Sequence, residues 1–379
     1  MLKNRYIKYC LGFFFLLLVA SCETPEKVLK NGSLDYKKNK AEYWYNKKKY
    51  ANAIPVLEEV MGLMKGKEST EKYYYMYCWA NYKLGDYLIS AYHFKNFTSL
   101  FPNSDKAEEC MYMYAKSYEK QSPKYELDQS NTFRAIEAFQ TFINLYPESN
   151  KRDTANQFID LLHRKIEVKA LEAAKLYYKT ENYKAAAASF DLITVQYPDI
   201  DDVEYIMYMI PKSYDKYAEK SIVSKQVERY QNVIVTGKKF LRKYPQSKYA
   251  QEITELIQNT HFKISKAAYE HADIAVTNEK EKLSGYAIKE INYQLPSITN
   301  PKLQKKAADY IVKTNLNLLK FNHLLATEAA KEEKMKLFEK TIKSYYNFAD
   351  KFKDTKYIKQ ADRIFKDSEK QINKLKKNG

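Results

Sequence analysis

A short motif that recurs at nearly constant spacing constrains the fold of this chain more than any other feature. It consists of an aromatic residue, proline, any residue and serine, and its prolines lie 45, 51 and 47 residues apart. A helix ends before a proline because the preceding residue is pushed out of the α region, and the serine can cap the next helix by accepting a backbone N–H. The motif therefore predicts helices that turn at regular corners. Its copies are Phe101–Ser104, Tyr146–Ser149 and Tyr244–Ser247, with Tyr197–Ile200 as a copy that lacks the serine.

A second pattern precedes each corner. Tyr82 and Tyr87 flank a short turn, and Phe94, Phe139 and Phe190 each lie eight residues before a proline of the motif. Tyrosine, turn, tyrosine, a small residue, an aromatic residue and proline together resemble the tetratricopeptide repeat. In that family each repeat is a pair of antiparallel helices. Repeats stack into a solenoid because none can bury its apolar face alone.

The composition agrees with a helical fold. The 379 residues include only 8 glycines and 10 prolines, and apolar residues recur every three to four positions. We predict an all-α fold, with a tetratricopeptide-repeat solenoid of about five helix pairs over residues 36–272 and a C-terminal helical extension over residues 273–379. The expected repeats span residues 36–68, 71–104, 105–149, 169–200 and 201–247, and the extension is expected to be helical near residues 281–292, 300–325, 328–351 and 355–376.

The N-terminus predicts export and a lipid anchor. Basic residues precede an apolar run, Leu11–Ala20, that is too short to span a membrane. The next residues, Ser21 and Cys22, complete a resemblance to the bacterial lipoprotein signal box. That resemblance implies cleavage before Cys22 and a diacylglycerol and an N-acyl chain on it, which together anchor a protein stably. A plain signal peptide with a chance cysteine is the alternative. We therefore expect a signal peptide over residues 1–21 and a lipidated, solvated tether over residues 22–35.

The sequence gives no indication of catalysis, of a metal or of another cofactor. The five histidines form no metal-type cluster, and there is no nucleophile elbow or phosphate-binding glycine-rich loop. Residues 1–21 carry three basic residues and no acid, so the net charge of +17 falls to +14 in the mature chain. Lysines interleaved with glutamates carry this charge, and we expect no nucleic acid partner for an exported chain. Cys78 and Cys110 are expected to be buried thiols, with a disulfide between them as the alternative.

A stripe of aromatic and polar residues is the candidate binding site. In tetratricopeptide arrays the first helix of each repeat lines a groove, and aromatic side chains there offer a large contact area to an extended or helical peptide. Counting back from the turns places one stripe on the first two repeats, although Tyr75 and Trp79 could instead belong to the core. The candidate groove residues are Glu42, Tyr45, Asn46, Lys72, Tyr75, Trp79, Tyr82 and Lys83.

The lipoprotein box followed by about five such repeats resembles the BamD family of the outer-membrane β-barrel assembly machinery. The resemblance covers Cys22 to about residue 265, and the extension after residue 275 departs from it. It implies a non-enzymatic scaffold, lipid-anchored in the outer membrane and facing the periplasm. Its implied partners are the periplasmic domains of the barrel-forming assembly subunit and segments of unfolded barrel proteins. Another envelope scaffold of the cell wall or of secretion, or a glycan-capturing lipoprotein of nutrient uptake, are the alternatives.

Overall fold

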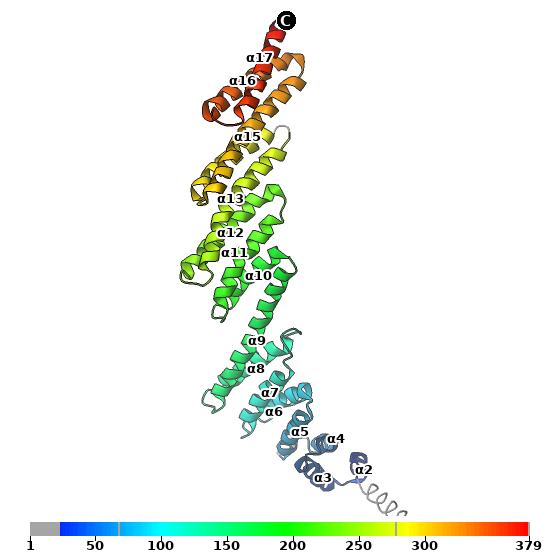
Figure 1. Cartoon of the computed structure of the whole chain (residues 1–379). Helices are drawn as coiled ribbons and strands as arrows, with labels where there is room; N and C mark the ends of the chain where they lie inside the picture. The colour runs from blue at the N-terminus through cyan, green and yellow to red at the C-terminus, as the bar shows by residue number, and fades with distance from the viewer. Residues whose placement is uncertain (1–22, 67–68, 277–278, 378–379) are drawn as a thin grey trace, which may run out of the picture. The chain divides into compact units, whose positions relative to one another are not determined.

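The computed structural model describes residues 23–66, 69–276 and 279–377 (Figure 1). The chain divides into two compact units between Lys169 and Ala170. Throughout the described ranges the regular structure is helical, which confirms the all-α prediction. The first unit contains α2 (Pro25–Asn31), α3 (Leu34–Asn46), α4 (Tyr50–Leu63), α5 (Thr70–Leu84), α6 (Tyr87–Leu100), α7 (Ala107–Gln121), α8 (Ser130–Leu145) and the first part of α9 (Arg152–Lys179).

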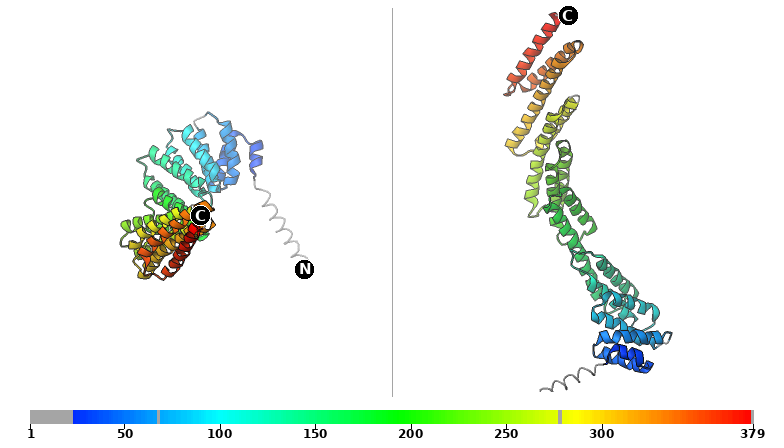
Figure 2. Two further views of the ribbon diagram at one scale, coloured as in Figure 1. Left: turned by 90° about the horizontal axis from the view of Figure 1, so that it is seen from above. Right: turned by 90° about the vertical axis from the view of Figure 1, so that its right-hand side faces the viewer.

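The second unit begins with the last ten residues of α9 and continues in the same style. Each helix packs on the next along the chain, as the successive helix pairs of Figure 2 show. The helices are α10 (Tyr183–Gln196), α11 (Val203–Glu219), α12 (Val223–Lys243), α13 (Ala250–Ile274), α14 (Glu279–Gln294), the 3-10 turn η1 (Leu295–Ser297), α15 (Pro301–Glu328), α16 (Lys331–Phe352) and α17 (Ile358–Lys377).

Tyrosine pairs close the turns inside the helix pairs. The rings of Tyr45 and Tyr50 meet edge to face with centroids 5.6 Å apart, and those of Tyr82 and Tyr87 do so at 5.3 Å. Tyr178 and Tyr183 repeat the arrangement in the second unit at 5.3 Å. Such aromatic pairs stabilise a contact by about 0.5–1.5 kcal/mol beyond their buried area. These pairs agree with a tetratricopeptide-type helix pair.

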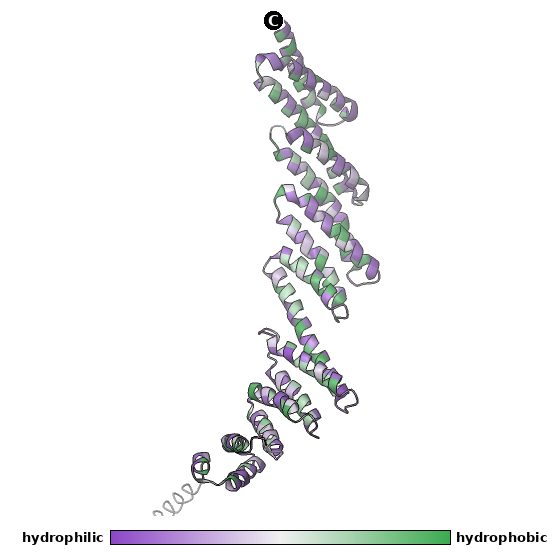
Figure 3. Cartoon of the chain, turned by 180° about the vertical axis from the view of Figure 1, so that it is seen from behind, coloured by the Kyte–Doolittle hydropathy of each residue, from purple (hydrophilic) through white to green (hydrophobic). Residues whose placement is uncertain are grey.

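Phenylalanines fill the core of the first unit. Phe94 and Phe139, eight residues before their prolines, are fully buried, as are Phe97 and Phe142, five residues before them. Burying such a side chain stabilises the fold by roughly 1.5–3 kcal/mol. The helices carry hydrophobic residues on one side and hydrophilic residues on another (Figure 3). The second helix of each pair is therefore held by a fixed set of positions counted from the corner.

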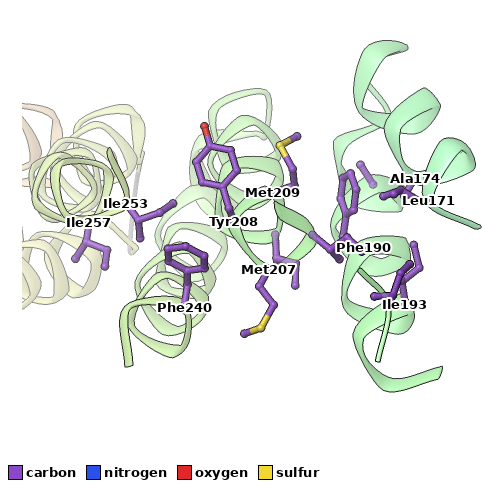
Figure 4. Close-up of a cluster of buried hydrophobic side chains, with 14 residues drawn as sticks. Leu171, Ala174, Phe190, Ile193, Met207, Tyr208, Met209, Phe240, Ile253 and Ile257 are labelled. Carbon is purple, nitrogen blue, oxygen red and sulfur yellow. The ribbon is translucent and has the colours of Figure 1, made fainter. Parts of the chain in front are cut away.

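The core of the second unit follows the same register with two exchanges, one of which is Ile193 at the fifth position before Pro198 (Figure 4). Phe190 and Phe240 are fully buried at the positions eight and five residues before Pro198 and Pro245. Gly237 stands where the eighth-position phenylalanine is expected. A Cβ there would meet Ile257 Cδ1 and Cγ1, each at 2.9 Å. The side chain of Ile257 in α13 thus occupies the space that phenylalanine fills in the other copies.

The serine of the motif links the turn before one helix pair to the first helix of the preceding pair by hydrogen bonds. Ser149 Oγ accepts the N–H of Lys151 at 3.1 Å and donates to Glu108 Oε1 of α7 at 2.6 Å. Ser104 makes the same pair of bonds to Lys106 and Glu71, and Ser247 does so to Tyr249 and Glu204. Each of these glutamates is the second residue of its helix. Each accepting bond comes from the residue just before the next helix, so the serine orders the corner turn and is not the predicted N-cap, whose place is taken by Lys106 at α7 and Tyr249 at α13. The bond to the glutamate links successive helix pairs.

Two segments differ from the expectation. Residues 25–31 form α2, in which Val28 is fully buried against the cluster of α3 and α4 residues. This part of residues 22–35 therefore packs as structure rather than as a solvated tether, because its one β-branched residue faces the apolar surface of α4. Helix α9 begins at Arg152, well before the expected repeat start at residue 169, since neither glycine nor proline interrupts residues 150–180.

Candidate functional site

The predicted stripe lies on the first helices of the first unit. We define the first-helix face as Glu42 of α3, Lys72, Tyr75, Trp79 and Lys83 of α5, Glu109 of α7, and Lys106, which directly precedes α7. The last two were not among the predicted residues. Glu109 could have been found by counting, because it is the third residue of α7 as Lys72 is the third residue of α5, whereas Lys106 lies before α7 and has no such counterpart on the stripe.

Charged and phenolic groups join α3 to α5 at one end of this face. Lys72 Nζ donates to Glu42 Oε1 at 2.6 Å, and the Tyr73 hydroxyl donates to the same oxygen at 2.9 Å. Burial and the hydrogen bond to Glu42 raise the pKa of Tyr73 to about 12, so this hydroxyl keeps its proton at neutral pH. Glu42 is thus a shared acceptor between two helices, and Lys72 remains more than half exposed.

Aromatic rings flanked by lysines form the middle of the face. The Tyr75 hydroxyl donates to Glu109 Oε2 of α7 at 2.7 Å, and burial together with this carboxylate raises the pKa of Tyr75. Lys106 Nζ lies 5.8 Å from the Tyr75 ring centroid, and Lys83 Nζ lies 5.1 Å from that of Trp79. Cations over aromatic faces at these distances attract the ring by about 0.5–1 kcal/mol at exposed sites.

Trp79 serves the face and the core together. Its ring centroid lies 6.4 Å from that of Tyr75 and 5.7 Å from that of the buried Phe94. Its Nε1 is shielded from solvent and has no hydrogen-bond partner in the described structure. The indole therefore packs its nitrogen inward and leaves part of its ring, beside Lys83, at the surface.

Three predicted residues lie apart from these contacts. Tyr45 and Tyr82 belong to the turn pairs, and Tyr82 also packs against the Phe94 ring at 6.4 Å. Burial, followed by the neighbouring Tyr50, raises the pKa of Tyr45 to about 12. Asn46 is exposed at the end of α3. The structure thus brings Glu42, Lys72, Tyr75, Trp79 and Lys83 together and places the two tyrosines in the hairpin interior.

The remaining candidate groups have structural surroundings. Cys22 lies outside the described residues. Cys78 and Cys110 are free thiols and fully buried, and burial raises the pKa of each. In the described ranges, no three His, Cys, Asp or Glu side chains are grouped so that they could hold a metal ion. No described helix has both the length and the apolar character that a membrane crossing requires.

Comparison with known families decides where this chain belongs. The sequence profile described as YfiO, outer membrane lipoprotein, matches residues 35–188 and 162–337. The chain belongs to the YfiO family of outer membrane lipoproteins. The match covers the helices of the first-helix face and continues far into the second unit. A comparison with curated protein sequences found no match.

Solved structures of helical repeat proteins are also similar to the chain. The TPR2AB domain of yeast Sti1, in a pHSP90 complex, is 11% identical, with 74% of this chain and 98% of that chain covered and a TM-score of 0.29. The C-terminal part of a TPR repeat-containing protein from Cytophaga hutchinsonii is 14% identical, with coverages of 85% and 98% and a TM-score of 0.21. Likeness at these scores says nothing about what this chain binds.

Proposed function

We propose that this YfiO-family chain is a non-enzymatic, lipid-anchored scaffold of the outer-membrane β-barrel assembly complex. The observation that carries the proposal is the family match over residues 35–188 and 162–337. In this proposal Cys22 bears the acyl chains, the polypeptide faces the periplasm, and the helical units bind the periplasmic domains of the barrel-forming subunit. Helix pairs stacked in this way offer extended surfaces for protein partners.

The first-helix face is the proposed receptor for segments of unfolded barrel proteins. Tyr75 and the outer part of Trp79 supply rigid aromatic area, which binds at a low cost in conformational entropy. Glu42 pairs with Lys72 and accepts from Tyr73, and Glu109 accepts from Tyr75, so both carboxylates have hydrogen-bond partners within the protein.

The exposed lysines of the first-helix face favour a ligand that ends in a carboxylate. Lys83 and Lys106 are exposed and lie over rings rather than in an ion pair with a carboxylate. They would attract a carboxylate, such as the C-terminal group of an aromatic-rich segment. Such segments are the ligands that the resemblance to the BamD family implies.

Purification of the full-length lipoprotein from detergent-solubilised outer membranes tests the proposal. We expect the barrel-forming assembly subunit among the proteins that co-purify, identified by mass spectrometry. The control is a tagged outer-membrane lipoprotein of another family, prepared in the same way. Recovery of cell-wall, secretion or glycan-uptake proteins without the barrel-forming subunit would contradict the proposal and favour one of the other scaffold roles.

A further inference from the structure

One face of α3 carries exposed aromatic rings bridged by a lysine. Tyr36 and Tyr43 are 40% and 50% exposed and lie seven residues apart, so they share one side of the helix. Lys40 lies between them, with its Nζ 5.6 Å from the Tyr36 ring centroid and 5.7 Å from that of Tyr43. We call Tyr36, Lys40 and Tyr43 the α3 outer stripe. The buried residues of α3 project from another side of the helix, so the packing of α3 on its described neighbours leaves both tyrosine rings exposed.

Glu23 ties the start of the described chain to this stripe. Its carboxylate forms an ion pair with Lys40 and accepts a hydrogen bond from the Tyr36 hydroxyl. These two hydrogen bonds lower the pKa of Glu23, so the carboxylate is ionised at neutral pH. Glu23 directly follows Cys22, the proposed acylation site. Because consecutive residues are covalently joined, acyl chains on Cys22 would enter a bilayer close to the stripe.

The charge around the stripe suits an anionic surface. Residues 23–50 contain eight lysines and four acidic residues, a net charge of +4. Lys47, Lys48 and Lys49 are all exposed in the turn after α3, and Lys47 continues the register of the stripe. Tyrosines favour the boundary between headgroups and water, and clustered lysines are attracted to anionic lipids.

We propose that the α3 outer stripe docks on the headgroups of an anionic phospholipid bilayer and so fixes how the first unit is held at the membrane. The proposal rests on the lipid anchor at Cys22 but not on a role in barrel assembly. It makes residues 23–43 an orienting contact rather than a free linker. The first-helix face, which begins at Glu42 on another side of α3, would then stay open to the periplasm.

Spin labels in the full-length acylated protein test this docking. The label is placed at residue 43 (Tyr43→Cys) and, as a matched control, at residue 92 (Tyr92→Cys). Tyr92 is 63% exposed on α6 and has apolar exposed neighbours, Leu88 and Ile89, but no comparable cluster of lysines. Cys78 and Cys110 are fully buried and should not react, which the unsubstituted protein checks.

In vesicles of phosphatidylethanolamine and phosphatidylglycerol, we expect the label at residue 43 to be several-fold less accessible to a water-soluble nickel relaxant than the label at residue 92. Equal accessibility at the two sites, or shielding of residue 92 alone, would overturn the proposal. In phosphatidylcholine vesicles the shielding at residue 43 should decrease, and shielding that is independent of lipid charge would overturn the electrostatic part.

A second variant tests the role of Glu23. Glu23→Gln removes the charge that pairs with Lys40 while the acyl anchor remains, which leaves Lys40 free to pair with anionic headgroups, so the label at residue 43 should become less accessible. Unchanged shielding in Glu23→Gln would overturn the function assigned to this residue. These readouts depend only on the membrane-bound protein, so they are separate from the co-purification that tests barrel assembly.

Discussion

Replacing Ser149 with alanine should destabilise the first unit by a measurable amount. The substitution removes the acceptor of the Lys151 N–H and the donor to Glu108. Loss of the hydrogen bond to the turn N–H of Lys151 costs about 0.5–1.5 kcal/mol, and loss of a hydrogen bond to a charged group costs about 1.5–3 kcal/mol. Glu108 is half-exposed and can bind water instead, so we discount the second contribution and expect a total of about 1–3 kcal/mol.

Thermal unfolding followed by circular dichroism measures this loss. In units of this size 1 kcal/mol corresponds to about 2–4 °C in Tm, so we expect a decrease of roughly 2–12 °C. Ser99→Ala is the matched control. Ser99 is an exposed serine whose hydroxyl makes a single 3.4 Å bond within its own helix, so its loss should change stability by less than about 0.5 kcal/mol.

A double-mutant cycle tests whether the loss of stability comes from the hydrogen bond between Ser149 and Glu108. Glu108→Ala and Ser149→Ala each remove the same hydrogen bond, so their combined effect should be smaller than the sum of the single effects by about 1 kcal/mol. If the stability losses of the two single variants add in the double variant, or if Ser149→Ala is as stable as Ser99→Ala, the corner serine does not link successive helix pairs.

Three further predictions concern the contact between α12 and α13, the half-buried His93 and the first-helix face. Gly285→Ala, where a new Cβ meets nothing within 4 Å, should raise Tm because alanine favours a helix by about 1 kcal/mol, whereas Gly237→Ala should lower it by crowding Ile257; equal shifts in thermal unfolding would contradict this. Burial lowers the pKa of His93, whose Nδ1 lies 2.9 Å from the Tyr74 hydroxyl, so the unfolded chain takes up this proton first. The free energy of unfolding should therefore keep its highest contribution from His93 above about pH 6.5 and decrease as the pH falls below this value. Urea titrations of His93→Gln should lack this part of the decrease. Trp79→Ala should weaken binding of aromatic-rich barrel C-terminal peptides at least tenfold in fluorescence titrations, and a loss of helicity with unchanged affinity would instead make Trp79 a core residue.

Local rules predicted most of the fold. Each corner proline ends a helix by its own covalent geometry, so the ends of α6, α8, α10 and α12 follow from the sequence. The same holds for the break between α14 and α15, which lies at Pro296 and Pro301, whereas the breaks after α15 and α16 contain no proline. The eighth-position phenylalanines were identifiable as core because their spacing from the corner is constant.

Contacts between distant residues could not be predicted in the same way. The partners of the corner serines, Glu71, Glu108 and Glu204, lie 33 to 43 residues earlier, and nothing local distinguishes them from other glutamates. Tyr45 and Tyr82 were placed on the binding face by helical spacing. In the structure their rings rotate toward Tyr50 and Tyr87, because an aromatic partner across the turn offers more contact than solvent.

The central claim, that the first-helix face receives unfolded barrel segments, is tested most directly by photocrosslinking in cells. A photoreactive phenylalanine analogue replaces Lys83, which is exposed beside Trp79, or Ser99 on α6 as the control. After irradiation, we expect mass spectrometry to find outer-membrane barrel proteins attached at position 83 and not at position 99. The absence of barrel-protein adducts at position 83, or the same adducts at both positions, would contradict it.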